Sequence, residues 1–223
     1  VNVYGGFPAT GTPGMNERNP KTHETILKAG VTSPEQMAAS ESTSYGRVLV
    51  QPSSFTTETV WNGFTITYGY LLSCYRQDIG GKLQTLNTEN VGTTGGAGVY
   101  LMSGGVLENC RIKDNWVLVI PNKTGMTQTG SSGGGFHQAG AGIYNAGGTI
   151  RNCVIEGNVL QHNLVKSGSN YESAWLYGAG LFQDKGNVYN TIICKNEGRV
   201  KGTTTNFHQV VAGAGACLVE GQF

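Results

Sequence analysis

The sequence predicts an all-β fold, a single-stranded parallel β-helix with long loops on one face, and three observations lead to this prediction. One phrase, which begins with Gly-Ala-Gly, recurs along the chain. Within it the apolar residues alternate with a period of two, which is the period of a β-strand and not of an α-helix. The length of the repeat varies in one segment alone, which is typical of a stacked repeat whose loops leave from one side.

The phrase is complete in three copies, and a fourth begins near the end of the chain. The spacing from its first glycine to its first asparagine is almost constant, and a second asparagine follows at a fixed interval each time. The stretch from there to the next copy becomes shorter along the chain. We therefore expect a rigid block of short strands followed by a variable loop. The copies span residues 96–115, 140–158 and 178–196, and the fourth opens at Gly213.

The two asparagines of each copy are predicted to form corners between strands. Asparagine and glycine tolerate a positive φ better than other residues do. A degenerate copy at residues 61–69 places Gly63 opposite the first asparagine and Gly69 opposite the second. The exchange of Asn for Gly at both positions indicates a left-handed backbone at both corners.

Copies stacked in register at about 4.8 Å would align like residues in columns through the core. The same register predicts ion pairs between Glu108 and Arg151 and between Lys113 and Glu156. It also makes Cys110 and Cys153 neighbours, either as thiols in the core or as a disulfide. The predicted columns are Val99, Ile143 and Leu181; Leu107, Ile150 and Val188; Cys110, Cys153 and Thr191; and Ile112, Ile155 and Ile193.

The phrases GAG-[IVL]-[YF] and G-x-I-x-N-C-x-I-x-x-N resemble a known family of repeats. They look like the right-handed parallel β-helix (pectin-lyase-like) repeats of large surface or secreted proteins of Bacteroidota. They are also similar to those of polymorphic outer-membrane autotransporters. The resemblance covers the chain from about Arg47 to its end. It implies a right-handed helix and a secreted, outer-membrane or cell-surface protein.

Two regions are expected along the chain. Residues 1–46 form an irregular N-terminal segment, in which Ser33 and Pro34 predict the start of a short helix to about Ala39, with a loop as the alternative. Residues 47–223 form the β-helix, about four and a half coils that break off within a coil. Because a solenoid normally carries capping repeats, the chain is expected to be part of a larger polypeptide.

The charge and the apolar runs of the chain each argue against one class of partner. With a net charge of +1 the sequence has no basic stripe, so a nucleic acid is not an expected partner. No apolar run approaches the roughly 20 residues that a membrane-spanning helix needs, so direct membrane insertion of this segment is not expected. The five cysteines and four histidines lack the spacing of a metal site, and neither a metal nor another cofactor is predicted.

Catalysis on a β-helix would need acidic residues that the fold brings together. Polysaccharide hydrolases use paired carboxylates, and calcium-dependent lyases use acidic ligands with a base. The aspartates Asp78, Asp114 and Asp184 fall at different positions of the repeat. We therefore expect a structural module, an adhesin or stalk, that is not catalytic in this segment. The alternative is a fragment of a polysaccharide lyase or glycoside hydrolase whose catalytic residues lie outside it.

Aromatic residues supply the candidate binding site. Tyr100, Tyr144 and Phe182 share one repeat position, and the strand period places them opposite the core, on the outer face. Exposed aromatics in a groove suit a glycan or an extended chain such as another surface protein. The alternative is that these rings are covered by the variable segments. Those segments carry the other candidates, Trp116, Trp175 and Tyr177.

Overall fold

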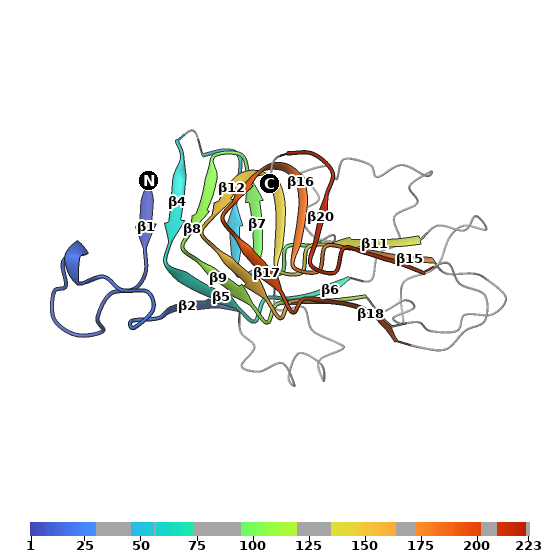
Figure 1. Cartoon of the computed structure of the whole chain (residues 1–223), viewed down its shortest axis with the longest axis horizontal. Helices are drawn as coiled ribbons and strands as arrows, with labels where there is room; N and C mark the ends of the chain where they lie inside the picture. Colours follow the sequence, from blue (N-terminus) through green and yellow to red (C-terminus); the bar gives the residue numbers. More distant parts are fainter. Residues whose placement is uncertain are drawn as a thin grey trace.

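The structure, a computed structural model, describes residues 1–29, 46–55, 57–73, 95–119, 135–163, 173–201 and 209–221. These residues form a right-handed parallel β-helix, which confirms the predicted fold class. All pairings between the named strands are parallel. In Figure 1 successive coils follow one another across the view from β1 to β20, while β6, β11, β15 and β18 extend away from them.

Four sheets run along the stack. Sheet A contains β1 (Asn2–Tyr4), β3 (Leu49–Gln51), β4 (Thr59–Asn62), β7 (Val99–Met102), β8 (Gly105–Glu108), β12 (Ile143–Arg151), β16 (Leu181–Tyr189) and β20 (Ala216–Leu218). Sheet B contains β2 (Thr25–Lys28), β5 (Phe64–Thr67), β9 (Arg111–Lys113), β13 (Val154–Glu156) and β17 (Ile192–Cys194). Sheet C contains β6 (Tyr70–Ser73), β10 (Trp116–Val119), β14 (Val159–Asn163) and β18 (Glu197–Lys201). Sheet D contains β11 (Gly135–Ala139), β15 (Ser173–Tyr177) and β19 (Gln209–Ala212).

One coil passes through the four sheets in turn. β12 crosses sheet A in two halves, with register shifts between Asn145 and Thr149. The chain then turns at Asn152 into sheet B and at Gly157 into sheet C. It returns through β15 of sheet D to the next Gly-Ala-Gly. The variable segments therefore begin and end as paired strands, whereas the sequence suggests loops throughout.

The core of the helix consists of the predicted columns. Ile155 is the register partner of both Ile112 and Ile193, and Ile150 pairs with Leu107 and Val188. The column of Val99, Ile143 and Leu181 is confirmed in the same way. Full burial of one such aliphatic side chain contributes roughly 1.5–3 kcal/mol. The apolar period of two thus becomes a continuous core because every coil repeats it.

The first corner has the backbone that the sequence predicts. Asn109, Asn152 and Asn190 have φ values of 53°, 55° and 43°, and Gly63 in the degenerate copy has a φ of 81°. A left-handed residue here turns the chain from sheet A into sheet B. Asparagine accepts this conformation at low cost, and glycine at none.

The prediction for the second corner is wrong by one residue. The positive φ lies on the residue before the asparagine, at Asp114 (53°) and Lys195 (56°) and likewise at Tyr68 and Gly157. The asparagines instead turn their side chains inward. Asn115 and Asn158 are fully buried, and the Nδ2 of Asn115 donates to the Oδ1 of Asn158 at 2.9 Å. We call Asn115, Asn158 and Asn196 the inner amide ladder.

The Gly-Ala-Gly motif serves two different needs. Its first glycine is left-handed, as at Gly140 with a φ of 61°. Its last glycine leaves room for the next coil: a Cβ on Gly142 would lie 2.5 Å from the carbonyl oxygen of Gly180 and 2.8 Å from the Nδ2 of Asn158. The motif therefore recurs because each coil must turn there and then pass close to both its neighbour and the inner amide ladder.

The N-terminal segment, which the sequence suggests is irregular, extends two of the sheets. β1 pairs with β4, and β2 pairs with β5. Between them the chain forms the short 3-10 helix η1 (Met15–Glu17). The predicted helix from Ser33 to about Ala39 lies outside the described residues. Residues 1–29 therefore belong to the stack, and the predicted division at Arg47 does not separate them from it.

Sheets C and D form two arms that pack on each other. Leu71, Val117 and Leu160 of sheet C lie in one buried cluster with Leu176 of sheet D, together with the alanines of the Gly-Ala-Gly motifs. This second core keeps both arms in a fixed relation to the coils. Among the described residues there is no helix with the length and apolarity that crossing a membrane requires.

Candidate functional site

The aromatic column exists, but its rings are not on an open surface. Tyr100 and Tyr144 stack at 5.1 Å and 10°, and Phe182 continues the column at 5.1 Å from Tyr144. Their exposed fractions are 2%, 2% and 1%. Sheet D covers them, since Ala139 and Tyr177 belong to the same cluster. The rings therefore do not form an outer column that faces a ligand. They are covered, as the alternative interpretation of the sequence predicts.

Burial shifts the pKa values of the ionisable groups at this column. The Arg47 guanidinium lies 5.2 Å from the centre of the Tyr100 ring, and its own burial lowers the pKa of Arg47 to about 10. Burial also raises the pKa of Tyr100 and of Tyr144. The column therefore acts as packing between sheets A and D.

The other predicted aromatics lie on the arms, and of the two whose side chains are described Tyr177 joins the aromatic column whereas Trp116 belongs to another cluster. Trp116 opens β10, where it is half-buried with the Arg199 guanidinium 5.6 Å from its ring centre. Tyr177 closes β15 and packs against Phe182 at 6.4 Å. Trp175 lies on β15 in register with His137 of β11, and its side chain is outside the described part. No common aromatic surface results among the described residues.

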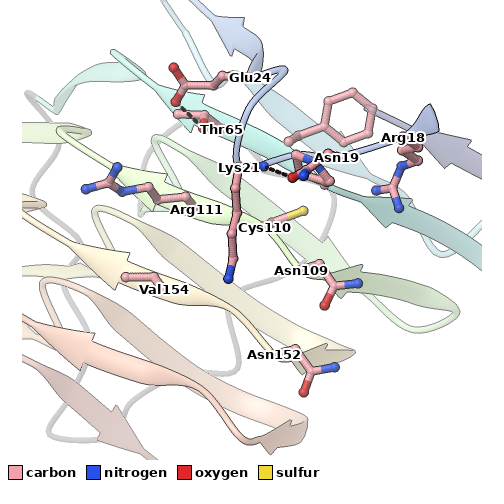
Figure 2. A pocket seen from close by; sticks show the side chains of 13 residues that line it. Arg18, Asn19, Lys21, Glu24, Thr65, Asn109, Cys110, Arg111, Asn152 and Val154 are labelled. Atoms are coloured by element: carbon pink, nitrogen blue, oxygen red, sulfur yellow. Dashed lines mark hydrogen bonds between the residues drawn. The ribbon is translucent and has the colours of Figure 1, made fainter. Parts of the chain in front are cut away.

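A groove of about 630 Å³ lies instead on the outer side of sheet B, next to the first corner (Figure 2). One wall is the N-terminal segment 18–24, and the floor is formed by three successive coils. Each coil presents the same part of the repeat, so the groove crosses the stack. The lining residues are Arg18, Asn19, Pro20, Lys21 and Glu24 of the wall, and Gly63, Phe64, Thr65, Asn109, Cys110, Arg111, Asn152 and Val154 of the coils.

The wall is anchored at both ends by polar contacts. Arg18 donates to the carbonyl oxygen of Gly5 and, at 2.9 Å, to that of Asn62, and its Nη2 also contacts the Asn62 side chain. At the other end the Thr65 hydroxyl donates to the Glu24 carboxylate at 2.6 Å. The wall is therefore held against the first coil.

Exposed asparagine amides follow the rim of the groove. Asn109 and Asn152 are exposed, and both line it. The Nδ2 of Asn109 donates to the Oδ1 of Asn62 at 3.3 Å, and the Nδ2 of Asn190 donates to that of Asn152 at 2.8 Å. We call Asn62, Asn109, Asn152 and Asn190 the outer amide row. Asn109, Asn152 and Asn190 occupy one position of the repeat and therefore follow one another at the coil spacing of about 4.8 Å. Asn62 is buried and lies one residue before Gly63, their counterpart in the first coil.

One predicted ion pair is confirmed and the other is replaced. Arg151 contacts Glu108 at 3.0 Å across neighbouring coils. Glu156 is the register partner of Lys113 but contacts Arg111, whose Nε donates to it at 2.5 Å. Lys113 instead contacts Asp114 at 3.8 Å. Side chains on adjacent strands reach diagonal neighbours as well as direct ones, and the longer arginine takes the carboxylate here.

The two stacked cysteines are buried free thiols. The Sγ of Cys110 lies 3.3 Å from the carbonyl oxygen of Trp61, and the Sγ of Cys153 lies 3.2 Å from the carbonyl oxygen of Arg151. A hydrogen bond between the thiols, together with burial, raises the pKa of Cys153. They line the core as the thiol alternative predicts. Within the described ranges, no group of three or more His, Cys, Asp or Glu side chains is placed to hold a metal.

Sequence reasoning missed the residues of the wall. Arg18, Lys21 and Glu24 lie in the segment that is predicted to be irregular. The available signal was the strand-like phrasing on either side of it, because two strands that pair with the first coil must bring the chain between them onto that coil.

Comparison of the chain with protein-family models, with curated proteins and with solved structures gives no match. The resemblance to pectin-lyase-like repeats of Bacteroidota therefore stays a prediction, while the parallel β-helix itself is seen directly.

Proposed function

We propose that this chain is a β-helical module of a secreted or cell-surface protein, an adhesin or stalk that contacts glycans through the groove on sheet B. The observation that supports the proposal most is the outer amide row, whose exposed members Asn109 and Asn152 face one groove from successive coils. The proposal keeps the function predicted from the sequence but moves the contact from the aromatic column to this groove.

The chemistry of the groove suits a polyhydroxylated chain. A primary amide both donates and accepts hydrogen bonds, so it can satisfy a sugar hydroxyl in either role. Val154 adds apolar surface between the polar groups, and ligand sites commonly combine apolar walls with a few placed polar groups. A repeating polymer can meet the same amide group on two successive coils, at Asn109 and Asn152.

The second candidate, a fragment of a polysaccharide lyase or glycoside hydrolase, has less support. Asp114 lies at the second corner and Asp184 lies on β16 of sheet A. Neither lines the groove. Asp78 lies outside the described residues. Incubation with uronic-acid polysaccharides tests this candidate, since unsaturated products with their ultraviolet absorbance would show lyase activity and would contradict the proposal of a non-catalytic module.

A glycan array tests the proposal. We expect the protein to bind a subset of glycans, and the double variant Asn109→Gly, Asn152→Gly to lose most of that binding. Asn190→Gly is the matched control: Asn190 has the same backbone and does not line the groove, and its change removes the hydrogen bond to Asn152 but leaves both groove amides in place. Glycine fits the positive φ, so neither change strains the corner. Equal loss in both variants, or no glycan bound at all, would refute the groove as a glycan site.

A further inference from the structure

We infer that the groove selects an anionic glycan, a polysaccharide with carboxylate or sulfate groups, and that the Lys21 amine binds the anionic group. This inference rests on the proposed function and narrows its ligand. It is based on which charged side chains of the groove already have a partner within the protein and which one does not.

Most charged groups of the groove have a partner within the protein. Arg18 donates to the carbonyl oxygens of Gly5 and Asn62. Arg111 is paired with Glu156. The Glu24 carboxylate accepts the hydrogen bond of Thr65. Each of these three side chains is therefore already held by a contact within the protein.

Lys21 is the exception. In the part of the chain that the structure describes, no ion pair or hydrogen bond of its amine is found, and the residue is exposed. Its backbone is held, since the Lys21 N–H donates to the Oδ1 of Asn19 at 3.0 Å. Figure 2 shows its side chain extending from the wall across the groove. An ammonium group on a fixed backbone, with three donors and no acceptor of its own, binds an anion.

The surroundings of Lys21 make the site one for a charged sugar and not for a small anion alone. Asn109 and Asn152 line the same groove from two coils, and Val154 adds an apolar contact. A sugar ring whose anionic group meets Lys21 can therefore place its hydroxyls against the amides. Since Arg111 is paired with Glu156, the remaining charged residues that line the groove are Arg18, Lys21 and Glu24, two cations and one carboxylate.

Dextran, carboxymethyl dextran and dextran sulfate share one backbone and differ in charge, so their binding to the full chain tests the inference. We expect at least one charged polymer to bind about tenfold tighter than dextran, and the preference to weaken at high ionic strength. Lys21→Gln should remove most of the preference, and Lys21→Arg should retain it. Carboxymethyl dextran and dextran sulfate separate carboxylate from sulfate recognition.

Lys28→Gln is the matched control, because it removes the same charge from an exposed lysine that does not line the groove. Equal effects of Lys21→Gln and Lys28→Gln, or equal binding of charged and neutral polymers, would overturn the inference. If Lys21→Gln has no effect while Asn109→Gly, Asn152→Gly still abolishes array binding, the glycan groove stands and its selectivity for anions does not. If the array shows no bound glycan, the proposed function itself fails.

Discussion

Each coil contains two asparagines with opposite roles. Asn152 sits at the first corner with its amide exposed on the groove, whereas Asn158 sits just past the second corner with its amide fully buried. The Asn158 side chain donates to the carbonyl oxygens of Ile112 and Glu156 at 3.0 and 3.1 Å and accepts from the Asn115 N–H at 3.1 Å. It thus satisfies backbone groups that the turn leaves unpaired.

We predict that Asn158→Asp lowers the free energy of unfolding by about 3 kcal/mol or more. A carboxylate has the same shape but cannot donate, so it would be buried against the two carbonyl oxygens that Asn158 now serves. Asn152→Asp makes the same chemical change at an exposed position and should cost less than about 0.5 kcal/mol. Urea denaturation of both variants measures the difference, and similar midpoints would contradict the structural role of the inner amide ladder.

Among the elements, the aromatic column joins sheet A to the arm formed by sheet D. We predict that Tyr144→Ala lowers the free energy of unfolding by about 3–5 kcal/mol, because it opens a cavity between two stacked rings. Tyr144→Phe keeps the stack and should cost far less. Neither variant should change glycan binding as long as it remains folded. A specific loss of binding in a folded Tyr144 variant would restore the column as the ligand site.

Sheet C contains a buried histidine that should make stability depend on pH. His162 lies on β14 in register with Val200 of β18, and burial lowers the pKa of His162 to about 4. The unfolded chain binds this proton below about 6.5 and the folded protein does not. The free energy of unfolding is therefore highest above pH 6.5 and falls as the pH drops toward 4, by at most about 3 kcal/mol.

Urea denaturation of the native chain and of His162→Gln across this range checks the prediction. The variant should lose most of the slope between pH 6.5 and 4. His23→Gln, at a half-buried histidine of the N-terminal segment, is the control and should keep it. An unchanged slope in His162→Gln would assign the pH dependence to other groups.

At the scale of the molecule, the described strands pair only between neighbouring coils, and such a stack is least stable at its ends. Burial already shows this: Ile112 and Ile155 are fully buried, whereas Ile193 in the same column is half-buried. We predict that amide hydrogen exchange is slowest in β9 and β13 and much faster in β17 and β20. Uniform protection from end to end would show that the chain unfolds as one unit.

The coil could be predicted from the repeat alone. The spacing of its glycines, asparagines and aliphatic residues predicts the parallel strands, the four columns and the left-handed first corner, because these depend on a period that every copy repeats. The Glu108–Arg151 pair follows from the same register.

Folding in three dimensions adds what the repeat does not contain. The arms of sheets C and D come from segments of unequal length, so no period shows that they pack on each other and cover Tyr100, Tyr144 and Phe182. The inward turn of Asn158 depends on carbonyl oxygens of the neighbouring coil. The groove needs Lys21, which lies far before Asn109 in the chain and reaches the coils only because β1 and β2 pair with them. These contacts join segments that do not repeat with the same period. They depend on how side chains pack in three dimensions, so the repeat pattern does not predict them.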